Sequence, residues 1–314
     1  MKVYKDIEDF KPIHNAVVTT GTFDGLHKGH KVIIQRIKKL AAESGGQSVV
    51  VTFYPHPQLV LHPNEKYLYI LNTQEEKIKL FEDHNIDHLV FIQFTPEFAK
   101  LSYTDFIKNI LVDKLHVHKL VIGYDHHFGK DREGQLQHLV DFGKQFNFDV
   151  EQIPAQKIGD VMVSSTKIRK ALLLGAILSA NKFLGYRYLL SGRVVKGDGI
   201  GRTLGFPTAN IELNDPHKLV PANGVYAIEA EVKNLRYGGM LNIGTRPTFN
   251  GVKLVIEANI FDFDENIYYE TLHIRFVERL RNEIKFENIE LLQEQLVKDK
   301  ENSLKMLKKN KEEF

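Results

Sequence analysis

The chain has 314 residues, more than one typical domain holds, so its length predicts two domains that each build their own hydrophobic core. Its 42 lysines and arginines nearly balance its 40 aspartates and glutamates, and the formal net charge of +2 argues against bulk binding of nucleic acid or of a membrane surface. The sequence contains no cysteine, which excludes disulfides, thiolate nucleophiles, iron–sulfur clusters and cysteine zinc sites, and is compatible with a reducing compartment.

The sequence shows neither a signal peptide nor a membrane span. Residues 1–15 lack the apolar core of a signal peptide, and no segment approaches the roughly 20 apolar residues that cross a bilayer. We therefore expect a cytoplasmic protein with neither a membrane nor a nucleic acid as partner.

The first half of the chain alternates apolar runs with amphipathic stretches. Strands are predicted at residues 16–20, 48–54, 88–94, 119–124 and 149–154, with helices between them that include 102–115 and 135–147. The first helix carries an apolar face formed by Ile33, Ile34, Ile37, Leu40 and Ala41, and Gly45 ends it. A capping box at Thr73 and Glu76 begins the next helix, which carries Ile78 and Phe81. Because strands alternate with helices, we expect an α/β domain with a doubly wound parallel sheet.

The pattern changes after about residue 186. Closely spaced strands are predicted at residues 188–195, 224–232, 237–244, 253–261 and 270–277, separated by turn signals. Such a series is typical of an antiparallel β-barrel or sandwich, and an amphipathic stretch at 288–309 predicts a terminal helix. We place the domain boundary at this change, which gives domains 1–186 and 187–314.

The loop between the first strand and the first helix reads GTFDGLHKGH over residues 21–30. His27 and His30 are three residues apart at a helix start and project from one face. Glycines permit close backbone approach, and the helix N-terminus offers free N–H groups and partial positive charge. The loop therefore predicts an anion site suited to a polyphosphate. Two histidines at this spacing can also be a solvated helix end or an incomplete metal pair, but the strand-loop-helix context and the glycines favour the anion site.

A second polar cluster, SSTKIR, lies at residues 164–169. Its hydroxyls precede a helix, and its basic side chains, Lys167 and Arg169, lie in the first turn, so free amides and a guanidinium can converge on phosphate oxygens. Taken alone, the cluster is a plain helix cap with basic decoration.

Together the two strings resemble the HxGH and SSTxIR motifs of HIGH-type nucleotidyltransferases. They look in particular like the adenylyltransferase module of the bacterial bifunctional riboflavin kinase/FMN adenylyltransferase family, also called prokaryotic FAD synthetase. The intermediate segments PHP at 55–57 and GYDHHFGKDREG at 123–134 match that family's motifs in order. The resemblance implies a Rossmann-like first domain that transfers an adenylyl group from ATP to FMN and releases pyrophosphate.

The resemblance also implies roles for particular residues of the first domain. His27, His30 and Arg169 are expected to be catalytic, with the histidines neutralising phosphate charge and Arg169 holding the departing pyrophosphate. The remaining expected ATP contacts are Gly21, Phe23, Asp24, Gly29, Ser165 and Thr166. Phe53, Asp125 and Phe128 are expected at the flavin.

The segment GRVVKGDGIGRTLGFPTAN at residues 192–210 carries a second set of signals. Lys196 and Arg202 lie among its glycines, in a loop that can fold its amides over phosphates. Thr208 and Asn210 follow Pro207, and in an extended segment their oxygens point to the same face, where they suit Mg²⁺. Read alone, this is a turn-rich connection before a strand.

The string GRxLGFPTAN nevertheless resembles the riboflavin kinase module of the same family. Segments at 224–226, 242–249, 257–263 and 280–286 resemble it in order. The resemblance implies that Lys196, Gly197, Gly201, Arg202, Thr208 and Asn210 bind ATP, that Thr208 and Asn210 hold Mg²⁺, and that Glu257 is the catalytic base. Without the family pattern, Glu257 is an outward-facing strand glutamate. The family often has histidine two residues later, where this chain has Asn259.

We therefore expect riboflavin and ATP to give FMN in the second domain, and FMN and ATP to give FAD and pyrophosphate in the first. The alternative is that one activity is retained while the other domain is a flavin-binding or regulatory module. A third reading is nucleic-acid binding, because the HIGH-type fold is shared with aminoacyl-tRNA synthetases and residues 298–311 are rich in lysine. Neighbouring acidic residues offset that charge, so a solvated helical face is favoured.

Overall fold

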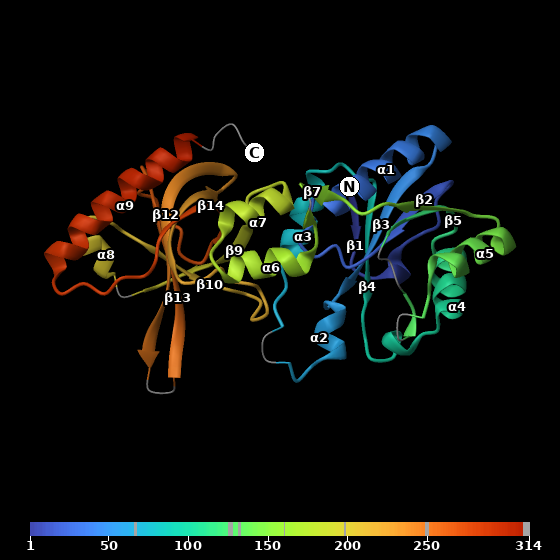
Figure 1. Ribbon diagram of the computed structural model, residues 1–314, viewed down its shortest axis with the longest axis horizontal. Helices are drawn as coiled ribbons and strands as arrows, with labels where there is room; N and C mark the ends of the chain where they lie inside the picture. Colours follow the sequence, from blue (N-terminus) through green and yellow to red (C-terminus); the bar gives the residue numbers. More distant parts are fainter. Residues whose placement is uncertain are drawn as a thin grey trace. The chain divides into compact units, whose positions relative to one another are not determined.

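The structure is a computed structural model that describes residues 1–65, 68–124, 128–130, 133–159, 161–197, 199–248 and 251–309 (Figure 1). Contacts within the chain divide it into two compact units, Met1–Ser165 and Thr166–Phe314. Within the described ranges, none of the helices is both long enough and apolar enough to cross a bilayer.

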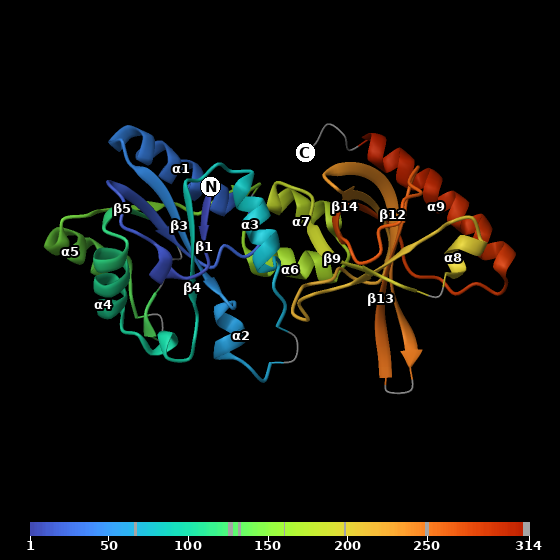
Figure 2. The same ribbon diagram turned by 180° about the vertical axis from the view of Figure 1, so that it is seen from behind.

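The first unit is built on a parallel sheet in the order β1-β4-β3-β2-β5-β6 (Figures 1 and 2). Its strands are β1 (Lys2–Tyr4), β2 (Ala16–Thr20), β3 (Gln47–Tyr54), β4 (His88–Gln93), β5 (Val117–Gly123) and β6 (Asp149–Ile153). The structure confirms the predicted doubly wound fold. The sequence pattern missed β1, because this short edge strand has no apolar run and two of its side chains are exposed.

Helices connect these strands and cover the sheet. They are α1 (Lys28–Ser44), α2 (Pro57–Leu61), α3 (Gln74–Glu82), α4 (Tyr103–Asp105), the π-helix η3 (Phe106–Lys114) and α5 (Leu136–Phe146). Short 3₁₀ turns lie at η1 (Ile7–Asp9) and η2 (Phe98–Lys100), and β7 (Lys157–Ile158) pairs with β8 (Val161–Met162) in a small hairpin. The helix predicted at 102–115 is therefore wound more widely over most of its length.

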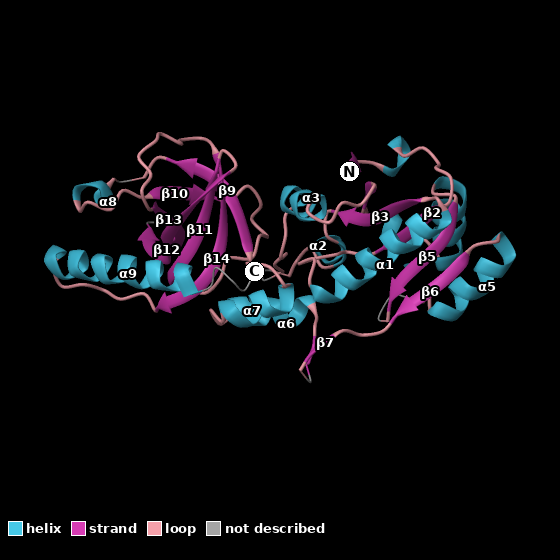
Figure 3. Ribbon diagram, turned by 90° about the horizontal axis from the view of Figure 1, so that it is seen from above, coloured by secondary structure: helices cyan, strands magenta, loops and turns pink. Residues whose placement is uncertain are grey.

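The apolar periodicity explains how α1 and α5 reach the sheet. The predicted face of α1 is buried, and α1 ends at Gly45, which adopts the left-handed conformation with φ 62°. Alternate side chains of the central strands, among them Val18 and Val51, pack against η3 and α5 in the main hydrophobic core. Helices α1 and α5 lie on opposite sides of the sheet (Figure 3).

The strand order fixes where a ligand site is expected in this unit. The chain runs from β2 through β3 to β4 on one side, and then crosses back to place β5 on the other side of β2. Ligands of open α/β sheets bind beyond the carboxyl ends of the strands at such a reversal. The loop that leaves β2 at Gly21 lies at this position.

The second unit contains a closed antiparallel barrel in the order β10-β13-β12-β11-β14-β9 (Figure 3). Its strands are β9 (Leu189–Val195), β10 (Ala209–Glu212), β11 (Gly224–Val232), β12 (Leu235–Thr248), β13 (Gly251–Ile260) and β14 (Thr271–Arg281). The barrel confirms one of the two expected all-β architectures. Strand β10 was missed as a separate strand because it is short and follows a proline-containing loop.

Helices flank the barrel. Helix α8 (Ile200–Thr203) lies in the glycine-rich segment, and the terminal helix α9 (Ile289–Lys309) packs along β11, β12 and β14. Arg281 fixes α9 through a bidentate ion pair, with its Nε 2.9 Å from Oδ1 and its Nη2 2.7 Å from Oδ2 of the buried Asp299. Gln293 Nε2 also donates to the Leu204 carbonyl at 3.3 Å, which connects α9 to the segment that follows α8.

Two further helices, α6 (Ser165–Leu173) and α7 (Ile177–Leu184), precede the barrel, and all but the first residue of α6 belongs to the second unit. The buried Asn181 side chain explains the grouping of α7, because Nδ2 donates to the Phe276 carbonyl at 2.9 Å and Oδ1 accepts from Tyr188 N at 2.8 Å. The division by contacts thus falls before α6, whereas the sequence pattern places it after residue 186. The boundary at 186 stays a prediction about the functional domains.

Two candidate active sites

The two histidines of the GTFDGLHKGH loop form a stacked pair at the start of α1. His27 is the N-cap residue, and its Nδ1 accepts a hydrogen bond from His30 N at 3.3 Å. The ring centroids are 3.6 Å apart with planes at 12°. Because Nδ1 of His27 is an acceptor, the proton of the neutral ring lies on Nε2. Gly29 permits this arrangement, since a Cβ there would lie 3.1 Å from His27 Nδ1.

His30 is a neutral donor. The edge of its ring meets Phe23 at a centroid distance of 5.1 Å, and its buried Nδ1 has no partner among the described residues. Burial, followed by the positive fields of His27 and Lys77, holds the pKa of His30 well below its usual value. At pH 7 the ring therefore offers a hydrogen bond rather than a standing positive charge, which refines the expected role in charge neutralisation.

Asp24 organises the loop. Its buried Oδ1 accepts from Leu71 N at 2.9 Å and from Asn72 N at 3.2 Å. In return, Asn72 Oδ1 accepts from Gly25 N at 2.9 Å, where the loop turns with φ 88°. The expected nucleotide contact through the Asp24 carboxylate stays a prediction, because the observed bonds of Oδ1 are structural.

Ser165 brings the two motifs of the first domain together. Its Oγ donates to the Asp24 carbonyl at 2.7 Å, although the two residues are 141 positions apart in the chain. Thr166 and Arg169 continue α6 from this point, and Arg169 lies one turn beyond Ser165 on the same side of the helix. The phosphate-binding roles expected for Thr166 and Arg169 stay predictions.

Sequence reasoning missed three side chains behind the loop. Lys77 Nζ donates to the Thr22 carbonyl at 2.8 Å and to Thr52 Oγ1 at 3.2 Å, and both Lys77 and Thr52 are buried. Asn72 Nδ2 is a buried donor that lacks a partner within the described part of the chain. No short motif marks these positions, although a lysine at a buried position of α3 breaks the apolar pattern.

The residues expected at the flavin are placed unevenly. Phe53 is half-buried at the end of β3, with its ring 5.7 Å from Phe94 and 6.0 Å from Phe98. Phe128 is only 7% exposed and packs on Phe106 in the hydrophobic core, which leaves its ring little free surface. Asp125 lies outside the described residues. The flavin contacts of all three stay predictions.

In the barrel, Glu257 of β13 lies between two asparagines. It is directly opposite Asn210 on β10 and directly opposite Asn242 on β12. Residues paired in this way share one face of a sheet. The flanking residues Ile256 and Ala258 are buried in the barrel, so Glu257 points to the outside. The register therefore places the expected base beside an expected metal ligand.

The backbone of the glycine-rich segment lies in close contact with Asn210 and Thr208. A Cβ at Gly197 would lie 2.0 Å from Asn210 Nδ2, and one at Gly201 would lie 2.4 Å from the Phe206 carbonyl and 3.2 Å from Thr208 Oγ1. Only glycine fits at both positions without displacing backbone or the asparagine. Lys196 and Arg202 are exposed nearby in the sequence, where they can meet an anion.

Polar contacts hold the rest of the site. Arg246 Nη2 lies 3.2 Å from Glu257 Oε1 and forms an ion pair with it. Asn259 Nδ2 donates to the Pro207 carbonyl at 2.7 Å, next to Thr208. The asparagine found where the family often has histidine thus anchors the segment that carries the expected metal ligands.

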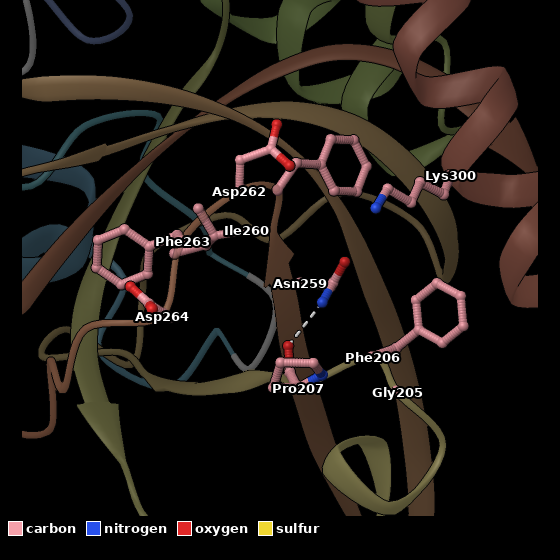
Figure 4. Close-up of a pocket in the computed structure, with 10 residues that line it drawn as sticks. Gly205, Phe206, Pro207, Asn259, Ile260, Asp262, Phe263, Asp264 and Lys300 are labelled. Carbon is pink, nitrogen blue, oxygen red and sulfur yellow. Dashed lines mark hydrogen bonds between the residues drawn. The ribbon is translucent and has the colours of Figure 1, made fainter.

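A pocket of about 380 Å³ opens beside these residues (Figure 4). Its walls combine aromatic rings with charged side chains and are formed by Gly205, Phe206, Pro207, Asn259, Ile260, Phe261, Asp262, Phe263, Asp264 and Lys300. Lys300 of α9 places its Nζ 5.4 Å from the centre of the Phe261 ring. This lysine was interpreted from sequence as part of a solvated helical face, whereas the structure places it in the pocket wall.

The expected metal ligands Thr208 and Asn210 suit a hard cation. They offer hydroxyl and amide oxygens, which are ligands that Mg²⁺ takes alongside phosphate oxygens and water. No group of three or more histidine, cysteine, aspartate or glutamate side chains is placed to hold a metal ion in the part of the chain that the structure describes. The residues present therefore fit a cation that is held jointly by the protein and a nucleotide. They fit less well a metal that the protein alone binds.

Comparison with known proteins identifies both parts of the chain. A family model described as FAD synthetase matches residues 10–167, and one described as riboflavin kinase matches residues 184–307. A bifunctional riboflavin kinase/FMN adenylyltransferase of Listeria monocytogenes is 38% identical over 290 residues, covering 92% of this chain and 91% of that protein. The protein of the same name from Bacillus subtilis is 38% identical over 295 residues, covering 92% of each.

A solved structure is also similar over almost the whole chain. It is described as a macrolide-efflux protein from Streptococcus pneumoniae, has a TM-score of 0.86 and 32% identity, and the match covers 96% of this chain and 98% of that one. Because both family models match in order and the curated relatives align over most of its length, the chain belongs to the bifunctional riboflavin kinase/FMN adenylyltransferase family.

Proposed function

We propose that the chain makes FAD from riboflavin in two ATP-dependent steps. The barrel transfers the γ-phosphoryl group of ATP to riboflavin and gives FMN and ADP, and the parallel-sheet domain transfers the adenylyl group of a second ATP to FMN. The observation that carries the proposal is the register of Glu257 between Asn210 and Asn242, because it joins a proton acceptor to oxygen ligands on the matched kinase domain. Since both steps use ATP, we place them in the cytoplasm.

In the kinase step, Glu257 accepts the proton of the riboflavin hydroxyl as that oxygen bonds to the γ-phosphorus and ADP leaves. Arg246, paired with Glu257, keeps the carboxylate oriented. Thr208 and Asn210 would hold Mg²⁺, which when bound supplies charge stabilisation to the ATP phosphates. Lys196, Arg202 and the amides near Gly197 and Gly201 would receive the phosphate oxygens.

The pocket beside Pro207 is our candidate for the nucleobase of ATP in the kinase step. Its aromatic walls, among them Phe206 and Phe261, suit a flat heterocycle, and its charged groups can satisfy ring nitrogens and an exocyclic amine. Asn259 is bonded to Pro207, which precedes the expected metal ligand Thr208 by one residue and Asn210 by three. A base in the pocket would therefore direct its phosphates towards Thr208 and Asn210.

In the adenylyl step, a phosphate oxygen of FMN attacks the α-phosphorus of ATP, and the bond to the β-phosphate breaks to release pyrophosphate. This displacement needs positioning and charge stabilisation more than a covalent nucleophile. His27, His30, Gly29 and the free amides of α1 would stabilise the triphosphate. The unpartnered buried atoms His30 Nδ1 and Asn72 Nδ2 support this assignment, because leaving a buried polar group unsatisfied costs about 1–3 kcal/mol.

Arg169 and Thr166 would receive the leaving pyrophosphate, with Ser165 holding the start of α6.

The two steps are tested by separate incubations of the purified chain, one with riboflavin and ATP and one with FMN and ATP, resolved by chromatography. We expect FMN and then FAD in the first and FAD with pyrophosphate in the second. Absence of FMN from the first, or of FAD from the second, would reduce the chain to a single activity, and absence of both products would reject the proposal.

A further inference from the structure

Lys77 is a buried cation in contact with the backbone of the nucleotide loop. Its side chain is 5% exposed, and Nζ donates to the carbonyl of Thr22, the residue between Gly21 and Phe23. Its second acceptor is Thr52 Oγ1 on β3. The lysine therefore joins α3, β3 and the loop at a single atom.

The helix that carries Lys77 is held in a defined position. A capping box, in which Thr73 Oγ1 accepts from Glu76 N and Glu76 Oε2 accepts from Thr73 N, begins α3. The residue before it, Asn72, exchanges hydrogen bonds with Asp24 and Gly25 of the loop. Lys77 follows in the first turns, so its ammonium reaches the loop from an anchored helix.

Packing alone does not explain a lysine here. Thr52 Oγ1 itself donates to the Thr22 carbonyl at 3.1 Å, so an apolar side chain at position 77 would leave neither group without a partner. Burying an ammonium group is unfavourable unless a nearby negative charge compensates for the loss of water. Burial lowers the pKa of Lys77 to about 8, opposed by the field of Asp24.

The charge of Lys77 acts on His30 of the stacked histidine pair. It is one of the causes that lower the pKa of His30, after burial and His27. Lys77 thus places positive potential beside the same loop in which two buried nitrogen atoms lack partners in the described structure, His30 Nδ1 and Asn72 Nδ2. A polyphosphate is the kind of ligand that would meet both features.

We propose that Lys77 is a positioning residue for adenylyl transfer, which holds the Thr22 carbonyl and supplies a buried positive charge behind the triphosphate of ATP. This inference rests on the proposed adenylyltransferase activity. It assigns to Lys77 no contact with the reacting atoms, and it predicts that the charge matters more than the shape of the side chain.

The proposal has a pH signature. The field of Asp24 in the loop raises the pKa of Lys77, and the charge of Lys77 acts on His30 at the start of α1, while Glu76 on the same helix is engaged in the capping box. His30 is already neutral near pH 8 because its pKa is held well below the usual value, so a loss of activity above that pH would follow the ammonium of Lys77. The kinase step has no such dependence on Lys77.

The test compares Lys77→Met, Lys77→Arg and the matched control Lys79→Met, a half-buried lysine on the same helix. The full chain of each variant is assayed with FMN and ATP and, in the same preparation, with riboflavin and ATP. Lys77→Met should lower kcat for FAD formation by about 10²-fold, the usual effect of losing one preorganised electrostatic group, and change FMN formation less than twofold. Lys77→Arg should recover most of the loss and keep activity to higher pH.

Thermal unfolding separates this role from a merely structural one. Lys77→Met should melt at or above the temperature of the parent below pH 8, because it removes a buried charge. FAD formation by Lys77→Met within twofold of the parent, or an equal loss in Lys77→Arg and Lys77→Met, would overturn the proposal, as would a parallel loss of both activities with a lower melting temperature. If the parent chain itself makes no FAD, the proposed function fails instead.

Discussion

Asn210 and Glu257 are Cα partners across the antiparallel ladder of β10 and β13. A single register thus sets the candidate metal ligand beside the candidate base, although 47 positions separate them in the chain. A slip of one residue would turn one of the two side chains to the opposite face. The kinase site is therefore specified by strand pairing as much as by the identity of its residues.

Glu257→Gln should remove the proton acceptor while keeping the size and the register of the side chain. We expect kcat for FMN formation to fall by about 10²–10⁴-fold with little change in KM, the usual contribution of a general base. FAD formation from FMN should be unaffected. The measurement is steady-state kinetics of both steps on one preparation, and a kinase rate within threefold of the parent would remove Glu257 from the mechanism.

Gly197→Ala should disable the kinase for a steric reason. The added Cβ would lie 2.0 Å from Asn210 Nδ2, so either the loop or the candidate metal ligand must move. Displacements of about 1 Å at a reacting centre lower rates by about 10²-fold. Gly199→Ala is a useful comparison, because Gly199 has open space around it and φ 74°, so it reports backbone strain without a clash. Equal activities in the two variants would contradict the steric account.

His30→Ala should impair adenylyl transfer selectively. It removes a buried imidazole and one ring of the stacked pair, and the loss of one preorganised polar group lowers kcat by about 10²–10³-fold. His30→Asn, which retains a side-chain N–H, should recover part of the rate. Stopped assays of FAD formation give the comparison, and unchanged rates in both variants would show that the triphosphate is held elsewhere.

The buried lysine gives a stability prediction with a definite sign. Because the folded pKa of Lys77 is about 8 and its ordinary value is 10.5, the unfolded chain binds more protons between those two pH values. The free energy of unfolding contributed by this group therefore rises with pH across that window, by about 3 kcal/mol in all. Lys77→Met should lack this rise. Denaturant unfolding of both proteins at pH 7.5 and pH 9.5 tests it, and identical slopes against pH would contradict it.

Asp299→Asn should destabilise the barrel unit. Asp299 is 1% exposed and accepts a bidentate pair from Arg281, so the substitution leaves a guanidinium largely out of water. Breaking a buried pair by removing one partner costs about 3–5 kcal/mol. Urea unfolding should show this loss in the kinase transition. The exposed ion pair of Lys233 with Glu265 is the matched control, and Glu265→Gln should cost less than about 1 kcal/mol.

Most of the fold could be predicted because its signals are local. The apolar face of α1, the capping box of α3 and the β-branched runs of the central strands are all confirmed, as are the family resemblance and the two-part architecture. Strands β1 and β10 were missed because edge pairing and a proline-linked segment carry little apolar pattern. The closed barrel, rather than a sandwich, depends on pairings between distant strands.

The site residues, like the fold, could be predicted only where the signal is local in the sequence. Motif spacing could bring His27 and His30 together, but not the bonds that Lys77, Thr52 and Asn72 make from other elements. The opposition of Asn210 and Glu257 and the role of Asn259 depend on register. The sequence predicts Lys300 as part of a solvated helical face, because the pattern of a terminal helix does not indicate which pocket its side chains line.

The position of Lys300 makes the last helix part of the kinase wall. A proteolytic cut or a premature stop before residue 300 would remove Lys300 from the wall of the candidate nucleobase pocket, and would also remove Asp299, the ion-pair partner of Arg281. The nucleotide loop of the first unit would be unchanged. Such a shortened chain should therefore behave as a one-step enzyme that still consumes FMN but no longer supplies it.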